Sequence, residues 1–379
     1  MKKRKLEYID YFRGLAILSI VAGHALVWGK PGEAIDLSTR FIFKGGTWLF
    51  VFIAGFLFQY LSYKFDLKTF YKKKILNVVC PYIVTLTPAV MLCTFCNNNV
   101  QIPFHGMSKL IQIPSYYAFG FLLNYPVWFM GMIFIIFLIA PLLLYINRNK
   151  IMMYSSLFIS LTAAMCFNRP GLGRIMHYKL NTDITLAHRY LMYLLFYIRE
   201  ALFFLSVFLL GMFLCRYIED NQDKIKFIAR AILFYSSLTL LFLYILFVYK
   251  QVNFGQAIIR FSEIFFCLSL FICTENYIKN VRWLDKTLKF LAEYSFGIFF
   301  IHAYFINLLD HSSIYDFYGT VNDFWSTSHN SSSSLIHALI KFSFALFGSI
   351  ITLWIVKKAL NKIGVKNTRM FIGVESRQK

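Results

Sequence analysis

Hydrophobic residues occur along this chain in long blocks that short polar segments interrupt. A transmembrane helix needs about 20 consecutive, mostly apolar residues, and ten blocks of roughly this length follow one another. A shorter block near 112–123 is typical of a re-entrant or interfacial segment. The pattern predicts an all-α, polytopic membrane bundle of about ten transmembrane helices. We expect these helices near 9–29, 41–61, 75–95, 124–146, 151–167, 190–215, 227–249, 257–278, 288–309 and 335–358.

The composition agrees with a membrane environment. Hydrophobic residues make up 58% of the chain and charged residues only 15%, which is more apolar than an ordinary soluble domain. No linker rich in proline, glycine or serine divides the chain, and no internal repeat stands out. We therefore expect a single membrane domain over 1–379, ending in a basic cytoplasmic tail over 359–379.

The positive charge is distributed unevenly between the two sides of the expected bundle. The net charge is +21, from 39 Lys and Arg against 18 Asp and Glu. If the N-terminus is cytoplasmic, inner segments hold 25 of the basic residues, outer segments 8, and the spans 6. This bias is the positive-inside pattern, and it predicts that both termini are cytoplasmic. Because topology and anionic lipids account for the charge, we expect no nucleic-acid partner.

The first expected span carries three polar residues, Asp10, Arg13 and His24. Ionisable groups in hydrocarbon cost a few kcal/mol each, so they usually have a partner or a function. On a helix, Arg13 and His24 lie within roughly 20° of each other and about 16 Å apart in depth, and Asp10 lies about 60° from Arg13. This face is polar at both ends and apolar between them, at Ile17 and Ile20.

A second intramembrane histidine, His302, lies in the ninth expected span. It follows Lys289 by 13 residues, or about 20 Å, and His24 lies about 21 Å above Asp10. The two imidazoles are therefore expected at similar depth, where they would flank one polar chamber suited to general-base or covalent acyl chemistry. A proton pathway needs a similar polar chamber between helices. The simpler interpretation makes Asp10 and Arg13 interfacial anchors and His24 a hydrogen-bonded histidine of the bundle.

Metal binding is not expected. Cys93 and Cys96 form a lone CxxC pair, and no second pair or nearby histidine completes a zinc site. We interpret both cysteines as small buried hydrophobic residues.

Several segments together resemble acyltransferase family 3, a family of integral membrane acyltransferases. In the family, the first span carries an aspartate, then Arg-Gly, and then a histidine with ten residues between it and the arginine. The corresponding residues here are Asp10, Arg13, Gly14 and His24. Later segments match in order and spacing, so that the resemblance covers most of the chain. These segments read LFVFIAGFLF, YKKKILNVVCPY, YPVWFMGMIFIIFLIAPLLL, FFLSVFLLGMFL and YSFGIFFIHA.

Two positions depart from the family pattern. The second-span run usually ends in Ser-Gly-Phe, and here Ala54 replaces the serine, so no hydroxyl role carries over to it. The segment YKKKILNVVCPY usually holds two arginines three residues apart in this family, and here Lys74 and Asn77 stand in their place. Lysine can contact phosphate as a point charge but lacks the bidentate fork of arginine.

The resemblance implies transfer of an acyl group, most often acetyl from acetyl-CoA, to a hydroxyl of a sugar, a glycolipid or a cell-envelope polysaccharide. It implies a multi-pass protein of the plasma or bacterial inner membrane, with an acyl-CoA donor and a carbohydrate or lipid-linked saccharide acceptor as partners. Acetyl-CoA would be a substrate, and no metal would be needed.

Roles for individual residues follow from the resemblance and the helix geometry together. We expect His24 to deprotonate the acceptor hydroxyl or to carry the acyl group transiently, and His302 to position the acceptor or relay a proton. Asp10 would hold the Arg13 guanidinium from one turn away. Arg13 and the lysine run would bind the donor phosphates, and the pantetheine arm would pass Ile17 and Ile20. The run comprises Lys72, Lys73 and Lys74.

An alternative from another functional class is a proton-coupled transporter or a flippase for a glycolipid or small solute. Such folds often consist of related halves with broken helices in corresponding positions, and this chain shows no such symmetry. A structural or regulatory membrane subunit would leave the shared face of Arg13 and His24 unexplained. Consumption of acetyl-CoA by purified protein would separate an enzyme from the other two.

Overall fold

The computed structural model is helical throughout the part of the chain that it describes. The described residues are 91% helical and contain no strand, which confirms the predicted all-α class. The ranges described are 6–26, 33–96, 107–119, 127–166, 186–252, 256–311, 331–365 and 367–374.

Contacts within the chain divide it into two compact units. The first comprises Met1–Ile53 and Ile218–Lys379, and the second comprises Ala54–Tyr217. The two boundaries fall inside helices, one in α3 (Gly46–Tyr60) and one in α10 (Leu186–Asp220), and each unit is described by itself. That the whole chain acts as a single domain stays a prediction.

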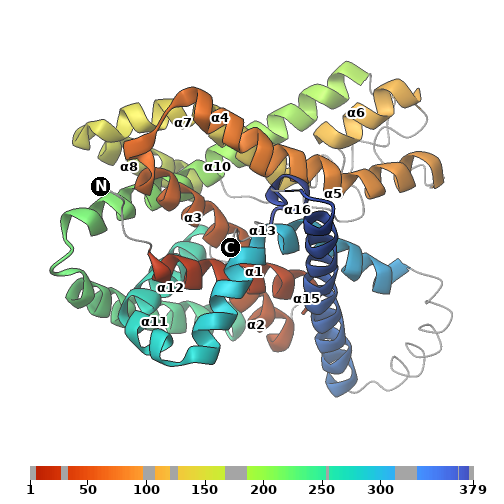
Figure 1. Ribbon diagram of the computed structural model, residues 1–379. Helices are drawn as coiled ribbons and strands as arrows, with labels where there is room; N and C mark the ends of the chain where they lie inside the picture. Colours follow the sequence, from red (N-terminus) through yellow and green to blue (C-terminus); the bar gives the residue numbers. More distant parts are fainter. Residues whose placement is uncertain are drawn as a thin grey trace. The chain divides into compact units, whose positions relative to one another are not determined.

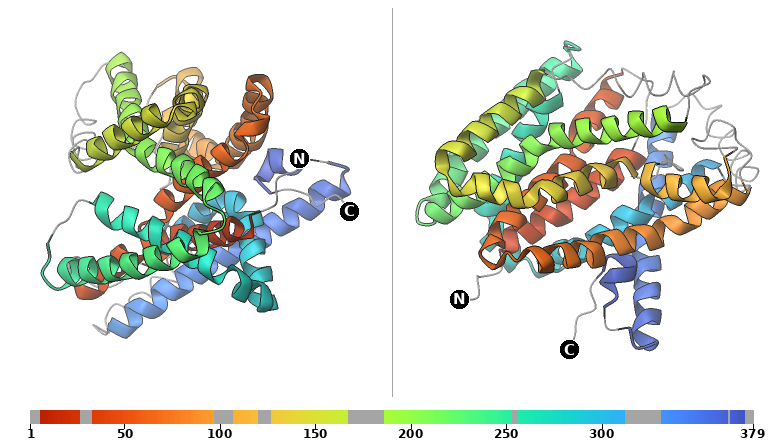
Figure 2. Two further views of the ribbon diagram at one scale, coloured as in Figure 1. Left: turned by 90° about the vertical axis from the view of Figure 1, so that its left-hand side faces the viewer. Right: turned by 90° about the horizontal axis from the view of Figure 1, so that it is seen from above.

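The first unit is built around two helices that begin at the same end, α1 and α13 (Figure 1). α1 packs along α13, and α12 and α15 pack against this pair, while α11 pairs with α12. Figure 2 shows α11 and α12, in green to teal, side by side. The helices of this unit are α1 (Glu7–Ala25), α2 (Ala34–Phe43), the start of α3, α11 (Ile225–Val248), α12 (Gln256–Asn280), α13 (Arg282–His311), α15 (Ser331–Lys362) and α16 (Arg369–Ile372).

A glycine sets the close approach of α1 to α13. A Cβ atom at Gly14 would lie 2.6 Å from the carbonyl oxygen of Leu288, closer than van der Waals contact allows. Because the obstacle is backbone, it cannot swing away as a flexible side chain can. Small residues allow this kind of backbone approach between membrane helices, which gives a physical reason for the glycine that follows Arg13.

Ion pairs align the starts of α1 and α13. Glu7 accepts from Lys279 at 2.8 Å and from Lys289 at 3.2 Å, and Lys289 also pairs with Asp285 at 2.6 Å. The Tyr11 hydroxyl donates to Asp285 at 2.6 Å. The hydrogen bond from Lys279 lowers the pKa of the Glu7 carboxyl below its ordinary value. Such partly exposed pairs add little stability one by one, but together they set the register of the two parallel helices.

The second unit consists of the rest of α3 and the helices that follow it. Asp66 begins α4, because its Oδ2 accepts from the backbone N–H of Thr69 at 2.8 Å, a typical N-cap. The elements are η1 (Ser62–Lys64), α4 (Leu67–Lys74), η2 (Ile75–Val79), α5 (Cys80–Met91), η3 (Leu92–Cys96), α6 (Lys109–Phe119), α7 (Val127–Arg148), α8 (Lys150–Cys166) and α10 (Leu186–Asp220) through Tyr217.

Eight helices among the described residues are long and apolar enough to cross a membrane. The expected spans near 9–29 and 151–167 are also helical, as α1 and α8, but are not among the eight. α1 carries charged residues and α8 has only 17 residues. The number ten and the cytoplasmic termini therefore stay predictions. The eight are Ala34–Tyr60, Leu67–Phe95, Trp128–Arg148, Tyr190–Asp220, Ile225–Val248, Ala257–Asn280, Arg282–Leu309 and Leu335–Lys362.

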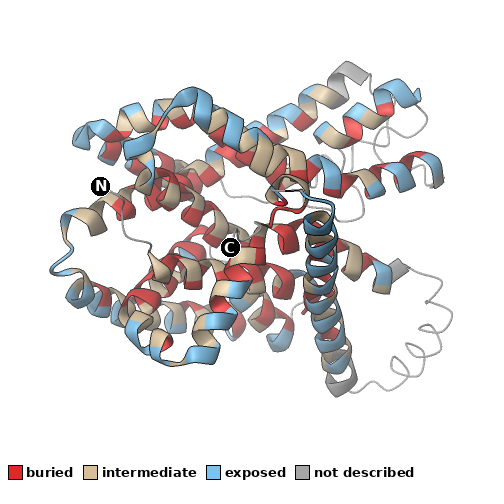
Figure 3. Ribbon diagram, in the orientation of Figure 1, coloured by how far each residue is buried: buried red, intermediate tan, exposed pale blue. Residues whose placement is uncertain are grey.

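Apolar side chains lie exposed along several of these helices. Much of α15 is exposed in Figure 3, and on α11 the residues Leu238, Leu241 and Phe242 are 50–60% exposed. Apolar surface of this extent is unfavourable in water and suits contact with lipid tails. The finding agrees with a multi-pass membrane protein.

Candidate active site

The two intramembrane histidines lie next to each other in the first unit. The ring centroids of His24 and His302 are 5.4 Å apart, with an angle of 43° between the ring planes. His24 is at the end of α1 and His302 is at the corresponding level of α13. The parallel register of the two helices therefore brings together residues that are 278 positions apart in the sequence.

His302 is buried and held by its own helix. Its side chain is 2% exposed, and its Nδ1 lies 2.8 Å from the carbonyl oxygen of Phe299 and 3.1 Å from that of Ile298. Carbonyl oxygens only accept hydrogen bonds, so we assign the proton to Nδ1. In the neutral ring, Nε2 is then the nitrogen that can accept a proton or a hydrogen bond.

His24 has the opposite character. It is exposed at the end of α1, and its ring contacts His302 without a hydrogen bond to any residue that the structure describes. An imidazole in this state can reach a substrate hydroxyl, which a fully engaged histidine cannot. The pair thus combines one accessible ring with one fixed ring.

The turn between α2 and α3 lies against α1 directly before His24. A Cβ atom at Gly23 would be 2.7 Å from the carbonyl oxygen of Phe43 and 3.7 Å from Cα of Lys44. The absence of a side chain at Gly23 lets the turn approach the helix this closely. Lys44 is exposed on this turn and interacts electrostatically with His24. Lys44 lies in the expected span 41–61, and the sequence analysis gave it no role.

A buried ion pair on α12 holds this turn in place. Arg260 is 4% exposed and donates at 2.8 Å to the carbonyl oxygens of Arg40 and Phe41, and to Oε2 of Glu263. The Glu263 carboxylate lies against Gly45, where a Cβ atom would be only 1.9 Å from Oε2. The sequence analysis missed this pair. Opposite charges three residues apart in an apolar span are the signal that indicates it.

Arg13, at the other end of the α1 face, contacts α13. Its Nε donates to the carbonyl oxygen of Ala292 at 3.0 Å, and its Nη2 donates to the same oxygen. The Ser295 hydroxyl also donates to this oxygen, at 2.8 Å. Arg13 thus links the two helices that carry the histidines. Its expected contact with donor phosphates stays a prediction.

The middle of the same face is closed in this conformation. Ile17 is fully buried and Ile20 is 4% exposed, and Ile20 packs against Gly46 at the start of α3. A pantetheine arm along this face, as the sequence suggested, would have to displace both isoleucines. Asp10 is half-buried one turn before Arg13, and its expected role in holding that guanidinium stays a prediction.

The expected donor lysines lie in the second unit, at the end of α4. Lys72 and Lys73 are exposed. Lys74 is half-buried, with its Nζ 3.7 Å from the ring centroid of Phe137 and 5.3 Å from that of Phe70, so cation–π contacts engage it. The two exposed ammonium groups are available to a soluble anion, and their role in donor binding stays a prediction.

The described residues contain no group of three or more His, Cys, Asp and Glu side chains that would hold a metal ion. The histidine pair alone supplies two nitrogens and no carboxylate or thiolate, fewer ligands than the sites of catalytic zinc provide. That the protein needs no metal stays a prediction.

Comparison with known proteins identifies the family. A family model described as an acyltransferase domain matches residues 6–356, a range that includes both histidines, Arg13 and the lysine run. Searches of curated proteins and of solved structures give no significant match. The family match covers far more than half of the chain and confirms the resemblance seen in the sequence motifs. The chain therefore belongs to acyltransferase family 3, the integral membrane acyltransferases.

Proposed function

We propose that this membrane acyltransferase moves an acetyl group from cytoplasmic acetyl-CoA to a hydroxyl of a sugar, a glycolipid or a cell-envelope polysaccharide. The contact between His24 and His302 carries the proposal, because it places an accessible imidazole beside a buried, anchored one in a chain of this family. Family membership supports acyl transfer in general, and the donor and acceptor named here are our proposal.

In this mechanism His24 acts as general base. It takes the proton of the acceptor hydroxyl while the hydroxyl oxygen attacks the thioester carbonyl carbon. The tetrahedral intermediate then breaks its C–S bond, and the proton passes from His24 to the departing thiolate. The products are an O-acetyl ester and free CoA thiol, so atoms and charge balance without an external oxidant or reductant.

His302 would act as a positioning residue. Its Nδ1 proton is held by the backbone carbonyls of Phe299 and Ile298, so the ring cannot easily turn. Its Nε2 would orient the His24 ring or the acceptor hydroxyl and would accept a proton shared with either. Burial of this ring also keeps bulk water from one side of the reacting groups, which limits hydrolysis of the thioester.

Lys44 would stabilise the negative charge that develops on the thioester oxygen. The turn that carries it is fixed on α1 beside His24 by Gly23 and by the Arg260–Glu263 pair. A positive group held in advance near a developing oxyanion needs no reorganisation when the charge forms. At the cytoplasmic end, the exposed Lys72 and Lys73 remain our candidates for the donor phosphates, whereas Arg13 is engaged with the Ala292 carbonyl oxygen.

The test is the rate of acetyl transfer by purified protein in lipid nanodiscs. His24→Ala should lower kcat by about 10²–10⁴-fold, as loss of a general base does, while acetyl-CoA binding persists. Thr239→Ala, at an exposed position of α11, is the control and should keep normal turnover. Normal transfer by folded His24→Ala protein would refute the base assignment. Acetyl-CoA that stays intact with wild-type protein and candidate acceptors would favour the transporter or flippase alternative.

A further inference from the structure

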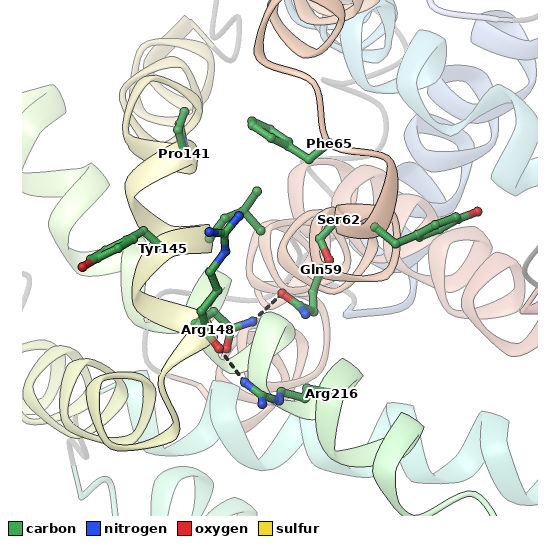
Figure 4. A pocket seen from close by; sticks show the side chains of 10 residues that line it. Gln59, Ser62, Phe65, Pro141, Tyr145, Arg148 and Arg216 are labelled. Carbon is green, nitrogen blue, oxygen red and sulfur yellow. Dashed lines mark hydrogen bonds between the residues drawn. The ribbon is translucent and has the colours of Figure 1, made fainter.

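The second unit contains a cavity of about 640 Å³ that the histidine mechanism does not use (Figure 4). It lies where the end of α3, the η1 turn, the end of α7 and the end of α10 meet. Its volume falls within the 300–1,000 Å³ range that is common for small-molecule sites. The positive-inside pattern assigns these helix ends to the cytoplasmic side, where soluble nucleotides are found.

Two arginines face this cavity, Arg148 from α7 and Arg216 from α10, and no carboxylate lines it. Arg216 is half-buried, and its Nη1 donates to the backbone carbonyl oxygen of Asn147. The Asn147 side chain in turn donates to Oε1 of Gln59. These hydrogen bonds, drawn in Figure 4, orient the Arg216 guanidinium before any ligand arrives.

Arg148 is exposed and has no hydrogen bond or ion pair with any residue that the structure describes. The cavity therefore holds two positive charges without a lining carboxylate to neutralise them. Guanidinium groups pair with phosphate through two parallel N–H donors, and such charge-assisted contacts are stronger than neutral hydrogen bonds. The charge pattern fits a ligand with more than one phosphate.

An aromatic ring supplies the second feature of the cavity. Phe65, which follows η1, lines the cavity with its ring toward it, whereas the Tyr145 ring on α7 points away (Figure 4). Aromatic faces accept the flat ring of a nucleobase by stacking, whatever the base. A lipid head group has no such ring. Two arginines together with the Phe65 ring therefore favour a phosphorylated nucleoside over a lipid head group.

The lysine run lies close to the same cavity. Lys74 covers the Phe137 ring, and the Tyr71 hydroxyl donates to the carbonyl oxygen of Leu138 at 3.0 Å. Pro141, which lines the cavity, follows Phe137 on α7 by one helical turn, or about 6 Å. The end of α4 therefore adds positive charge next to the cavity, where it would draw in a polyanion.

We propose that this cavity binds the adenosine phosphate part of the acyl-CoA donor, with Arg148 and Arg216 on its phosphates. The inference rests on the proposed function for the identity of the donor. An anionic lipid head group shares the phosphate chemistry, so the experiment must separate the two sources.

The first experiment compares two donors that carry the same thioester. Acetyl-CoA has the phosphates and the base, and S-acetyl-pantetheine has neither. Arg148→Gln should raise KM for acetyl-CoA about tenfold, the loss expected for one charged contact, and leave kcat and the KM for S-acetyl-pantetheine unchanged. Lys150→Gln removes an exposed charge two residues away that does not line the cavity, and it should leave every parameter unchanged.

The second experiment measures binding of adenosine 3′,5′-bisphosphate by titration calorimetry, which does not depend on activity. Wild-type protein should bind it, and Arg148→Gln and Arg216→Gln should each bind about tenfold more weakly. Arg216→Lys keeps the positive charge and a donor to the Asn147 carbonyl oxygen, so it shows whether weaker binding by Arg216→Gln reflects misfolding. Binding by Arg216→Lys that is intermediate between wild-type and Arg216→Gln supports the proposal.

The outcomes separate the two proposals. Wild-type affinity for both ligands in Arg148→Gln and Arg216→Gln would overturn the cavity assignment, even if the protein is an active acetyltransferase. The cavity assignment would also be overturned if the only change in these variants were a different dependence of activity on phosphatidylglycerol in the nanodiscs. Such a result would identify a lipid head group as the ligand of the cavity. Nucleotide binding without transfer from either donor would refute the proposed function and leave the cavity assignment supported.

Discussion

Replacement of Arg13 by methionine tests how the two histidine helices are held together. The guanidinium donates from Nε and Nη2 to the carbonyl oxygen of Ala292. A hydrogen bond from a charged donor is worth about 1.5–3 kcal/mol. In Arg13→Met, Ala292 keeps the Ser295 hydroxyl at 2.8 Å, so its carbonyl is not left without a partner. We therefore expect the lower end, a loss of about 1.5 kcal/mol in the free energy of unfolding.

The assay is denaturant unfolding of the purified protein in detergent micelles. Arg13→Lys retains one cationic donor and should lose about half as much free energy as Arg13→Met. Arg230→Met removes an arginine that is exposed on α11 and should leave the stability unchanged. This control separates loss of the helix contact from simple loss of positive charge.

The kinetic consequence follows from the position of the histidines. A weaker link between α1 and α13 lets the His24 and His302 rings move apart, so kcat should fall while KM for acetyl-CoA stays constant. The sequence alone predicts instead that Arg13 binds donor phosphates. Wild-type stability of Arg13→Met combined with a higher KM for acetyl-CoA would refute the helix-link reasoning and support phosphate binding.

Three further predictions concern the turn, the ion pairs and the topology. In Gly23→Val the new Cβ atom would lie 2.7 Å from the Phe43 carbonyl oxygen and push the turn away, an overpacking that costs about 1–3 kcal/mol. Turnover should fall more than acetyl-CoA affinity, and wild-type turnover would contradict a catalytic role for the turn. The pKa of Glu7 is lowered by Lys279, so this pair should stabilise the protein above the ordinary Glu value of 4.5 and lose that effect as pH falls below it. Thermal unfolding of Glu7→Gln should therefore depend less on pH between about 3 and 5. His329 lies outside the described residues, and His329→Cys should react with a membrane-impermeant maleimide in intact cells; labelling only after permeabilisation would reverse the orientation.

The sequence by itself determined the features that depend on local helix geometry. The long apolar blocks predicted a helical membrane protein, because only helices and closed barrels satisfy the backbone within lipid. The rise of 1.5 Å per residue placed His24 and His302 at similar depth, and the rings are in contact in the structure. The spacing of Asp10, Arg13, Gly14 and His24 indicated the family, which the match over residues 6–356 confirms.

Only the tertiary structure decided which helix faces meet. Arg13 binds a carbonyl 279 positions away, and nothing in the α1 sequence indicates that partner. The Arg260 side chain binds backbone carbonyl oxygens and so holds the turn that carries Lys44. Arg148 and Arg216 line one cavity from different helices. The physical reason is that lipid leaves apolar helix faces nearly equivalent, so small residues and a few polar contacts choose the neighbours. Gly14 and Gly23 are such residues, and their role becomes visible only when the backbone that packs against each of them is in place.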